Sequence, residues 1–383
     1  MYITRIGLDN FKSLVDFELP LAKLTCLIGL NGSGKSTVIQ GLDFLSRLFV
    51  GDLKGWLNER GWVAADINSK LITKSNVDLR IEMADGTKRL IWTGSFNRSQ
   101  LRCTKESLRL DGEEVFSLRD GKVDLPRRRS AATGEVAFEY SGSVLSALKP
   151  EALGEDGVLR FVQFMREVTS LDLLSPQSLR RRTDRSDGRL GLGGERLSAF
   201  LYELPASKQR ALMEQLIDCY PRLNQIDTRS LRRGWKELSI VERFGERSLT
   251  TEATHINDGL LRLMAVLAET LTDASFLLFD EIENGINPEL VEFLLDSLLK
   301  APQQVLVTTH SPMILNWLDD EVARAGVQYL YRDELGRTRS VPFFSIPSLS
   351  AKLAVMGPGE AFVDTELSQL PEEIAAIIGD QSG

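Results

Sequence analysis

Residues 28–37, which read IGLNGSGKST, constrain the fold of this chain more than any other segment. Gly29 to Ser36 fit the pattern G-x-x-x-x-G-K-S, in which glycines let a loop turn several backbone N–H groups inward. The apolar run at 21–30 predicts a buried strand before the loop, and apolar residues at helical spacing over 36–49 predict a helix after it. This order of strand, loop and helix predicts a phosphate-binding loop in an α/β fold.

The loop predicts contacts to the phosphates of a nucleoside triphosphate. The helix that begins near Gly34 adds the positive end of its dipole. We expect Lys35 to reach the β- and γ-phosphates and Ser36 to ligate Mg²⁺. The other loop residues expected to touch the nucleotide are Asn31, Gly32, Ser33, Gly34 and Thr37. The alternative is a glycine turn with an accidental lysine, which leaves the flanking strand and helix unexplained.

A second segment, at residues 274–295, predicts the acidic part of such a site. The apolar run from Phe276 to Phe279 is typical of a buried parallel strand, and Asp280 and Glu281 follow it directly. Open α/β sheets bind ligands at the carboxyl ends of their strands. We therefore expect Asp280 to hold Mg²⁺, directly or through water, and Glu281 to act as general base on the attacking water. Alternatively, the pair only ends the strand and begins a solvated turn.

His310 follows another apolar run, QVLVTT at residues 304–309. The segment after it starts a helix with Pro312 near the first turn. The chain has only two histidines, His255 and His310. A lone histidine is commonly structural, but this one ends a strand close to the acidic pair. We therefore expect His310 to contact the γ-phosphate.

Composition narrows the class of protein. Of the 383 residues, 43% are hydrophobic and 26% charged, as in soluble globular proteins, and the net charge of −8 argues against a generally basic nucleic-acid-binding protein. No apolar run approaches the roughly 18 residues that span a bilayer. The N-terminus does not resemble a signal peptide, and the three cysteines have no metal-binding spacing. We expect a cytoplasmic protein without a membrane partner.

Three arginine-rich patches interrupt this acidic chain. They comprise Arg127, Arg128 and Arg129, then Arg180, Arg181 and Arg182, then Arg232 and Arg233. Such patches can bind a nucleic-acid backbone or an acidic partner. The favoured interpretation is that they are solvated loop charges or ion-pair partners of the 54 acidic residues.

Together these segments resemble the ABC-type ATPases of the SMC/RecF/OLD group. DNFKSL at 9–14 resembles the N-terminal strand of that group, which implies that Lys12 and Ser13 contact the nucleotide. DEIENGINPELV at 280–291 resembles the group's run from the catalytic glutamate through the D-loop. The segment 255–271 stands where the group has its signature helix. The resemblance covers roughly the first fifty residues and 250–345.

The resemblance implies a head-to-tail homodimer with ATP between a phosphate loop and the partner's signature turn. Where the group has a serine and a glycine, this chain has Asn257, Asp258 and Gly259. Asn257 can cap a helix and donate an amide N–H, whereas the charge of Asp258 disfavours a nearby phosphate unless it points away. Alternatively, this turn only caps a helix. The group also senses Mg²⁺ with a glutamine, for which Gln163 and Gln177 are candidates and Gln177 is preferred.

The chain is expected to form an ABC-type ATPase head with a β-meander and a helical insertion. We expect the first part of the head at 1–140, a mainly helical insertion at 141–235, the second part of the head at 236–345 and a tail at 346–383. Alternating runs with Asp-Gly turns at 77–125 predict the meander, 157–220 predicts helices, and 235–253 and 327–346 each predict a strand pair. Without a sustained heptad pattern, no long coiled coil is expected.

Three functions fit these features. The first is a Mg²⁺-dependent ATPase, resembling OLD proteins without their Toprim nuclease domain, that regulates a separate effector such as a nuclease in prokaryotic antiviral defence. The tail supports this because it has no Asp-x-Asp motif for a nuclease metal site. The alternative is a RecF-like DNA repair or replication ATPase that binds DNA through the arginine patches. The nucleotide subunit of a transporter is disfavoured by the long spacing between Lys35 and Asp280.

Overall fold

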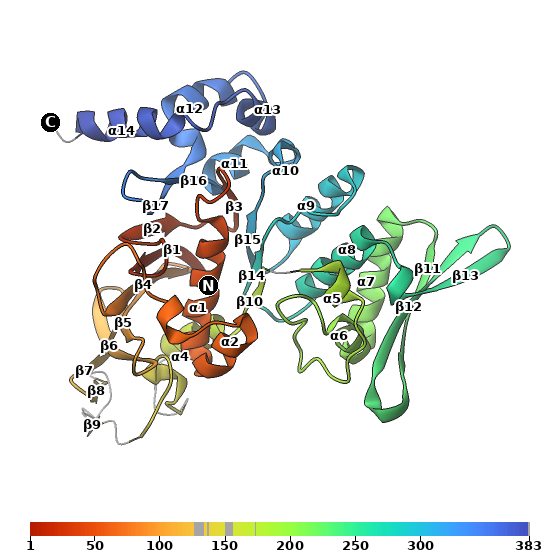
Figure 1. Cartoon of the computed structure of the whole chain (residues 1–383), viewed down its shortest axis with the longest axis horizontal. Helices are drawn as coiled ribbons and strands as arrows, with labels where there is room; N and C mark the ends of the chain where they lie inside the picture. The colour runs from red at the N-terminus through yellow and green to blue at the C-terminus, as the bar shows by residue number, and fades with distance from the viewer. Residues whose placement is uncertain (126–133, 136–137, 150–155, 173, 382–383) are drawn as a thin grey trace. The chain divides into compact units, whose positions relative to one another are not determined.

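The computed structural model describes residues 1–125, 134–135, 138–149, 156–172 and 174–381 (Figure 1). The chain divides into two compact units. The first comprises Met1–Val168 and Asp319–Gly383, and the second comprises Thr169–Leu318. Arg127, Arg128 and Arg129, the first arginine-rich patch, lie outside the described residues.

The first unit contains an eight-stranded antiparallel sheet with the order β2-β1-β4-β5-β6-β7-β8-β9. Its strands are β1 (Tyr2–Asp9), β2 (Phe17–Pro20), β4 (Asn76–Asp85), β5 (Lys88–Asn97), β6 (Arg102–Leu110), β7 (Glu113–Arg119), β8 (Lys122–Asp124) and β9 (Gly134–Glu135). Two of its hairpins turn at Asp111-Gly112 and Asp120-Gly121, where all four residues have positive φ. Such turns fit the twist of antiparallel strands, and the predicted meander at 77–125 is confirmed.

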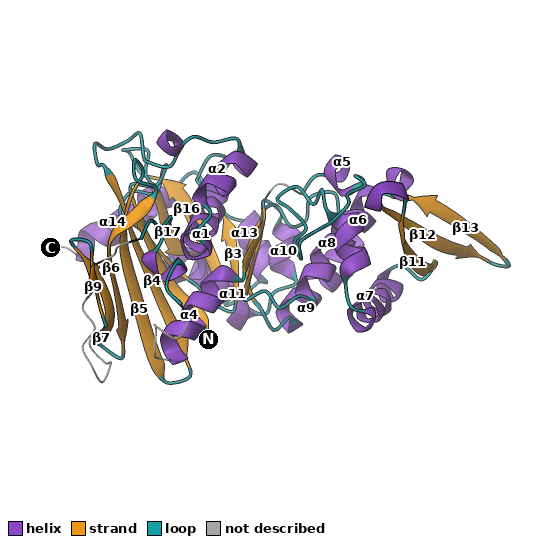
Figure 2. Ribbon diagram, turned by 90° about the horizontal axis from the view of Figure 1, so that it is seen from below, coloured by secondary structure: helices purple, strands orange, loops and turns teal. Residues whose placement is uncertain are grey.

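Helix α1 (Lys35–Val50), which follows the glycine-rich loop, packs on this sheet through aromatic side chains. Phe44 lies edge-on to Phe96 at 5.1 Å between ring centroids, and Phe49 lies edge-on to Trp92 at 5.0 Å. Helix α2 (Leu53–Arg60) follows it, and α4 (Asp156–Arg166) packs against α1. Figure 2 shows α1 and α4 beside the long strands of the sheet. The sheet therefore supports the helix that carries Lys35.

A second group of strands in the first unit includes the strand that leads into the glycine-rich loop. Strand β3 (Leu24–Ile28) is fully buried and pairs in parallel with β16 (Val327–Arg332), which forms a hairpin with β17 (Thr338–Pro342). Helices α11 (Asp320–Gly326), α12 (Pro347–Leu353), α13 (Pro358–Val363) and α14 (Leu370–Gln381) complete this unit. The strand pair predicted at 327–346 is confirmed, and it lies beside the strand that enters the loop.

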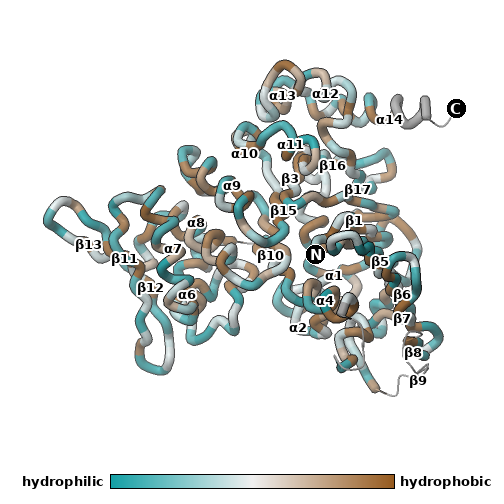
Figure 3. The backbone as a smooth tube through the Cα atoms, turned by 180° about the vertical axis from the view of Figure 1, so that it is seen from behind, coloured by the Kyte–Doolittle hydropathy of each residue, from teal (hydrophilic) through white to brown (hydrophobic). Residues whose placement is uncertain are grey.

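The second unit carries the acidic segment. Strands β14 (Phe276–Phe279) and β15 (Gln304–Thr308) are parallel neighbours, and β10 (Val168–Leu171) lies next to β14. Every residue of β14 and β15 is buried. Figure 3 shows the hydropathy of each residue along the backbone. The helices are α5 (Pro176–Leu179), α6 (Leu197–Glu203), α7 (Ala206–Cys219), α8 (Asp258–Thr270), α9 (Val291–Lys300) and α10 (Pro312–Asn316). A three-stranded antiparallel sheet comprises β11 (Leu223–Ser230), β12 (Lys236–Phe244) and β13 (Arg247–Glu252).

One local prediction is wrong. The helical interpretation of 157–220 fails at Val168–Leu171, which forms strand β10 because it pairs with β14 in the sheet, and such tertiary pairing outweighs local periodicity. The strand pair predicted at 235–253 is confirmed. Helix α1, with 16 residues, is the longest helix in the described part of the chain, so that part forms no coiled-coil arm. Among the described residues, no helix has the length and apolarity needed to cross a membrane.

Candidate nucleotide-binding site

The glycine-rich loop has a backbone that only glycine can supply. Gly29 and Gly34 adopt φ values of 147° and 112°. A Cβ atom at Gly29 would lie 2.2 Å from the carbonyl oxygen of Leu330, and one at Gly34 would lie 2.3 Å from Oγ1 of Thr338. Both the φ values and these close contacts exclude larger residues, because a side chain would push the loop away from strands β16 and β17.

Lys35 folds back into the loop that precedes it. Its side chain is buried, and its Nζ donates hydrogen bonds to the carbonyl oxygens of Gly29 at 2.9 Å and Leu30 at 3.2 Å. Ser36 is exposed and Thr37 half-buried at the start of α1. The ammonium of Lys35 thus lies within the ring of loop residues, where it can balance the charge of a bound phosphate.

Thr338 of β17 is hydrogen-bonded to the backbone of the loop. Its buried hydroxyl donates to the carbonyl oxygen of Ser33 at 3.0 Å and shares a 2.9 Å hydrogen bond with the hydroxyl of Ser13. The guanidinium of Arg332 donates to the carbonyl oxygen of Gly32 at 2.8 Å. Ser13, predicted as a nucleotide contact, therefore lies in a network that shapes the loop. Neither Thr338 nor Arg332 belongs to a motif, and only their place on β16 and β17 identifies them.

Lys12, the other residue that the resemblance implies, lies on the wall of a hollow beside this network. Its Nζ donates to Oε1 of Gln40 at 2.9 Å and lies 3.2 Å from the ring centroid of Trp62. The structure thus brings Lys12, Ser13 and the loop residues together in the first unit.

The acidic pair of the second unit is fixed by Thr308 at the end of β15. The Thr308 side chain is fully buried, and its hydroxyl donates to Oδ1 of Asp280. The same hydroxyl accepts from the backbone N–H of Glu281 at 2.8 Å. Glu281 has a φ of 47°, a left-handed conformation that side chains other than glycine rarely adopt. One hydroxyl therefore orients the carboxylate of Asp280 and holds the strained backbone from which the Glu281 side chain projects.

The loop that carries His310 is tied to the same turn. The backbone N–H of His310 donates to Oε1 of Glu283 at 3.0 Å, and the N–H of Ile282 donates to the carbonyl oxygen of Thr308 at 3.2 Å. Asn284 donates to Oε2 of Glu281 at 3.2 Å. Because β14 and β15 are parallel neighbours, their carboxyl ends bring Asp280, Glu281 and His310 to one edge of the strand pair.

Asn257 caps helix α8, as expected if this turn serves only to begin the helix. Oδ1 of Asn257 accepts from the backbone N–H of Leu260 at 2.8 Å. The carboxylate of Asp258 is bound by the guanidinium of Arg180, which also donates to the carbonyl oxygen of Ile256 at 2.7 Å. The charge that disfavours a phosphate near Asp258 is therefore paired with an arginine.

A second arginine lies near this turn. Burial lowers the pKa of Arg262 on α8, and the negative charges of Asp258 and Glu281 oppose that shift. A Cβ atom at Gly285 would lie 3.4 Å from Nε of Arg262. Arg262 stands outside any motif, so sequence reasoning missed it. Arg180 belongs to the second arginine-rich patch, but the sequence did not identify Asp258 as its partner.

The two glutamine candidates differ in setting. Gln177 is exposed in the short helix α5, the first helix after β10. Gln163 lies in α4 and donates to Oε1 of Glu167 at 2.9 Å. The preference for Gln177 stays a prediction.

The second and third arginine-rich patches differ in whether they form ion pairs. Arg180 and Arg182 of the second patch form ion pairs with Asp258 and Glu237. Arg232 and Arg233 are exposed in a turn between β11 and β12. The ion pairs of the second patch support the interpretation that these arginines serve acidic partners within the chain.

Mg²⁺ prefers oxygen ligands, such as hydroxyl and carboxylate groups. No group of three or more His, Cys, Asp or Glu side chains in the described ranges could hold a metal ion. Mg²⁺ beside a nucleotide needs no such group, because one or two protein oxygens and the phosphates suffice. The hydroxyl of Ser36 and the carboxylate of Asp280 are donors of this type.

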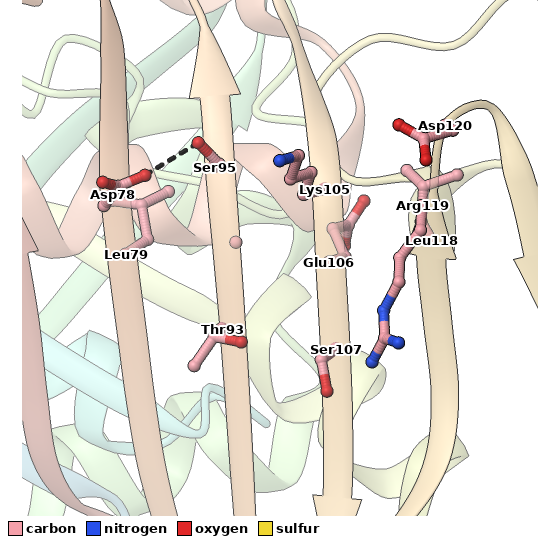
Figure 4. Close-up of a pocket in the computed structure, with 11 residues that line it drawn as sticks. Asp78, Leu79, Thr93, Ser95, Lys105, Glu106, Ser107, Leu118, Arg119 and Asp120 are labelled. Carbon is pink, nitrogen blue, oxygen red and sulfur yellow. Dashed lines mark hydrogen bonds between the residues drawn. The ribbon is translucent and has the colours of Figure 1, made fainter. Parts of the chain in front are cut away.

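A separate hollow of about 540 Å³ lies on the face of strands β4 to β7. Figure 4 shows Asp78, Ser95 and Lys105 side by side on three neighbouring strands, and Ser95 donates to Oδ1 of Asp78 at 2.7 Å. Its lining mixes acids and bases and includes no residue of the glycine-rich loop. This hollow is therefore not part of the candidate nucleotide site.

Comparisons with known proteins indicate the class of protein to which the chain is similar. Residues 1–105 match a family model described as "AAA ATPase domain", and residues 155–316 match one described as "AAA domain, putative AbiEii toxin, Type IV TA system". A curated relative, the OLD nuclease of Thermus scotoductus, is 40% identical over 43 residues. That match covers 11% of this chain and only 8% of the relative's length.

Two solved structures share the fold. The SMC head bound to the C-winged helix domain of ScpA has a TM-score of 0.56 at 15% identity, and the match covers 89% of this chain and 97% of that one. The SMC head with an extended coiled coil from Pyrococcus furiosus, bound to the C-terminal domain of ScpA, has a TM-score of 0.52 at 13% identity, with coverage of 92% and 99%. At such identities the likeness shows the fold alone.

The chain has the ABC-type fold of SMC heads together with a phosphate-binding loop, as the sequence predicted, and it matches AAA ATPase family models over residues 1–105 and 155–316. Within that class, the chain is similar to OLD-like ATPases over the short stretch that it shares with the OLD nuclease.

Proposed function

We propose that the chain binds Mg²⁺-ATP through residues 28–37 and hydrolyses it with Glu281 as the general base. The observation that carries the proposal is the ammonium of Lys35, buried within a loop in which Gly29 and Gly34 leave no room for side chains. Burying the charged ammonium of a lysine costs free energy, and a bound phosphate would offset this cost by pairing with the charge.

Each residue then has a chemical task. Loop N–H groups and Lys35 bind the phosphates, and Ser36 and Asp280 would hold Mg²⁺, which neutralises charge on the β- and γ-phosphates when bound. Glu281 accepts a proton as water attacks the γ-phosphorus, and the bond to the bridging oxygen breaks to release ADP. His310 contacts the γ-phosphate. Thr308 keeps Asp280 and Glu281 in place for this step.

ATP would join two copies of the chain head to tail. The N-terminus of α8, with Asn257, Asp258 and Gly259, would face the γ-phosphate bound by the other copy, and Gln177 would sense Mg²⁺. The pairing of Asp258 with Arg180 supports this arrangement because it removes an unbalanced negative charge from the turn.

The biological role would be that of a cytoplasmic sensor or regulator in a prokaryotic antiviral defence system. ATP-driven closure would control a separate effector, such as a nuclease. Support comes from the descriptions of the matched proteins, which name an AbiEii toxin and an OLD nuclease. The RecF-like alternative has less support, since Arg180 and Arg182 of the second patch bind acidic residues of this chain.

The test is ATP affinity of the full chain. Lys35→Ala should lose ATP binding by at least tenfold because the buried ammonium is the main charge in the loop. Lys54→Ala, which removes an exposed lysine of α2, is the matched control and should bind like the parent. Unchanged ATP affinity in Lys35→Ala would refute the proposed site.

A further inference from the structure

The three-stranded sheet of the second unit, whose strands β11, β12 and β13 are labelled in Figure 1, joins two arginine-rich patches of the sequence. Strand β12 follows the turn that holds Arg232 and Arg233. The backbone N–H of Lys236, the first residue of β12, donates to the carbonyl oxygen of Thr183 at 2.6 Å. Because Thr183 directly follows Arg182, this bond brings the second patch beside the third. Residues far apart in the chain therefore share one surface.

A buried glutamate orients two arginines on one face of this sheet. The side chain of Glu237 on β12 is only 5% exposed, and its carboxylate pairs with Arg182 and with Arg229 of β11, whose Nε donates at 2.6 Å. The side chains of Arg182 and Arg229 are themselves 51% and 69% exposed. Glu252 lies 3.6 Å from Arg182 at the edge of this cluster. The ion pairs therefore hold both guanidinium groups in place without burying them.

Trp235 lies on the same face as these arginines. Its backbone is extended, and it stands two residues before Glu237, so alternation along the strand places both side chains on one face. Lys236, between them, points the other way, and its ammonium lies 4.1 Å from the ring centroid of Tyr202. Trp235 is 46% exposed, and no aromatic ring or cation among the described residues packs against its indole ring. The face thus presents a free aromatic surface beside two fixed cations.

The turn before Trp235 adds two more cations. Arg232 and Arg233 are exposed, and neither forms an ion pair with any residue that the structure describes. Arg233 and Gly234 have φ values of 65° and 85°, and the backbone N–H of Leu231 donates to the carbonyl oxygen of Trp235 at 2.7 Å, which closes the turn. The turn therefore keeps both arginines next to Trp235. The Trp235 face is defined here as Trp235, Arg182, Arg229, Arg232 and Arg233.

Single-stranded nucleic acid carries the two kinds of group that match the Trp235 face. Its phosphates pair with guanidinium groups, and its unstacked bases offer flat surfaces to an indole ring. A duplex keeps its bases stacked on one another, and an acidic peptide supplies carboxylates without such surfaces. We propose that the Trp235 face binds single-stranded nucleic acid, with a base on Trp235 and phosphates on the four arginines. The inference does not rest on the proposed ATPase activity, since it uses no residue of the nucleotide site.

Fluorescence anisotropy of the full chain with labelled oligothymidylate tests the proposal. The oligonucleotide should have about 20 nucleotides, more than the roughly 4–16 that one single-strand site covers. A duplex of the same length and polyglutamate are the comparison probes. We expect oligothymidylate to bind at least about tenfold more tightly than either probe at equal salt concentration. Equal or tighter binding of the duplex or of polyglutamate, or no measurable binding of the single strand, would overturn the proposal.

Variants then assign the binding to this face. Trp235→Ala should weaken oligothymidylate binding about tenfold with an unchanged salt dependence, because stacking releases no counterions. Arg232→Ala combined with Arg233→Ala should lower the slope of log Kd against log salt concentration by about 1.4, roughly 0.7 for each lost phosphate contact. Trp317→Ala and Arg210→Ala remove exposed side chains elsewhere in the second unit and are the matched controls. All these positions are exposed, so thermal midpoints should match that of the parent. Parental affinity in Trp235→Ala, or a parental slope in the double variant, would refute the Trp235 face as the binding surface.

Discussion

The hydroxyl of Thr308 donates a hydrogen bond to the carboxylate of Asp280, and the same oxygen accepts the backbone N–H of Glu281. Thr308 lies two residues before His310 and is fully buried at the end of β15. Its proton points to Asp280 because a carboxylate oxygen accepts it, whereas the backbone N–H of Glu281 can only donate to the hydroxyl oxygen. Thr308 is thus a positioning residue for both acids.

Replacing this hydroxyl should slow catalysis without weakening nucleotide binding. We expect Thr308→Val to lower kcat for ATP hydrolysis about tenfold, while ATP affinity stays within about twofold, because it removes one hydrogen bond from each acid. Thr308→Ser should recover most of the rate. Thr270→Val removes another buried threonine hydroxyl, one that bonds to the Leu267 carbonyl, and is the matched control. A parental kcat in Thr308→Val would refute the positioning role.

Glu281→Gln should separate ATP binding from hydrolysis. The variant keeps the size of the side chain but cannot accept the proton of the attacking water, so we expect a loss of about 10²- to 10⁴-fold in kcat. Single-turnover hydrolysis and equilibrium ATP binding measure the two effects. Glu289→Gln changes an exposed glutamate on the same segment and should leave the rate unchanged. Turnover at the parental rate in Glu281→Gln would show that another group is the base.

The Arg180–Asp258 pair should govern how easily ATP brings two copies together. In an Arg180→Ala variant the Asp258 carboxylate loses its partner, so we expect severalfold more ATP to be needed for half-maximal dimerisation. Sedimentation velocity in a Glu281→Gln background measures this quantity. Adding Asp258→Asn to Arg180→Ala should restore much of the response, and Arg232→Ala serves as the exposed-arginine control. A double variant no better than Arg180→Ala would exclude the electrostatic explanation.

Stability should fall as the pH rises toward neutrality, and Glu106 should contribute to the fall. Burial raises the pKa of Glu106 from 4.5 to about 7, although Ser143, Val144 and Trp92 donate hydrogen bonds to it. Between these two values the folded chain holds a proton that the unfolded chain has released, so folding is favoured less as the pH rises through this window.

We therefore expect the thermal midpoint to drop between pH 5 and pH 8 and Glu106→Gln to reduce the drop by a few degrees. Scanning calorimetry at the two pH values measures the difference. Burial also raises the pKa of Glu269 to about 7, so part of the dependence should remain in the variant. Glu113→Gln, at an exposed position of β7, should show the full parental drop. The same drop in Glu106→Gln would rule out this carboxyl as a contributor.

Local patterns account for most of the elements and for the motif residues. The Asp-Gly turns of the meander, the strand before Gly29 and the helix after Lys35 all follow from residues close in sequence. The run from Phe276 to Phe279 ends as a strand at the residue before the acidic pair.

The residues that hold the site in shape could not be predicted in this way. Thr308, Thr338 and Arg180 act through partners far away in the chain. Thr308 lies in a predicted strand and Arg180 in an arginine-rich patch, but no local pattern identifies the partner of either residue or marks Thr338. Strand β10 was missed for the same reason, since its four residues become a strand only beside β14. The candidate catalytic and binding residues could therefore be predicted from the sequence, whereas the residues that position them could not.

The bond between Thr338 and Ser33 spans 305 residues, and it has a consequence for how the protein is made. At about 5–20 residues per second, a ribosome that has completed residues 28–37 works for roughly 15–60 s more before strand β17 emerges. Until then, neither Thr338 nor Arg332 is present to hold the backbone around Gly32 and Ser33. A nascent chain thus carries the motif without its finished shape, and the capacity to bind nucleotide appears only after strand β17 has been made.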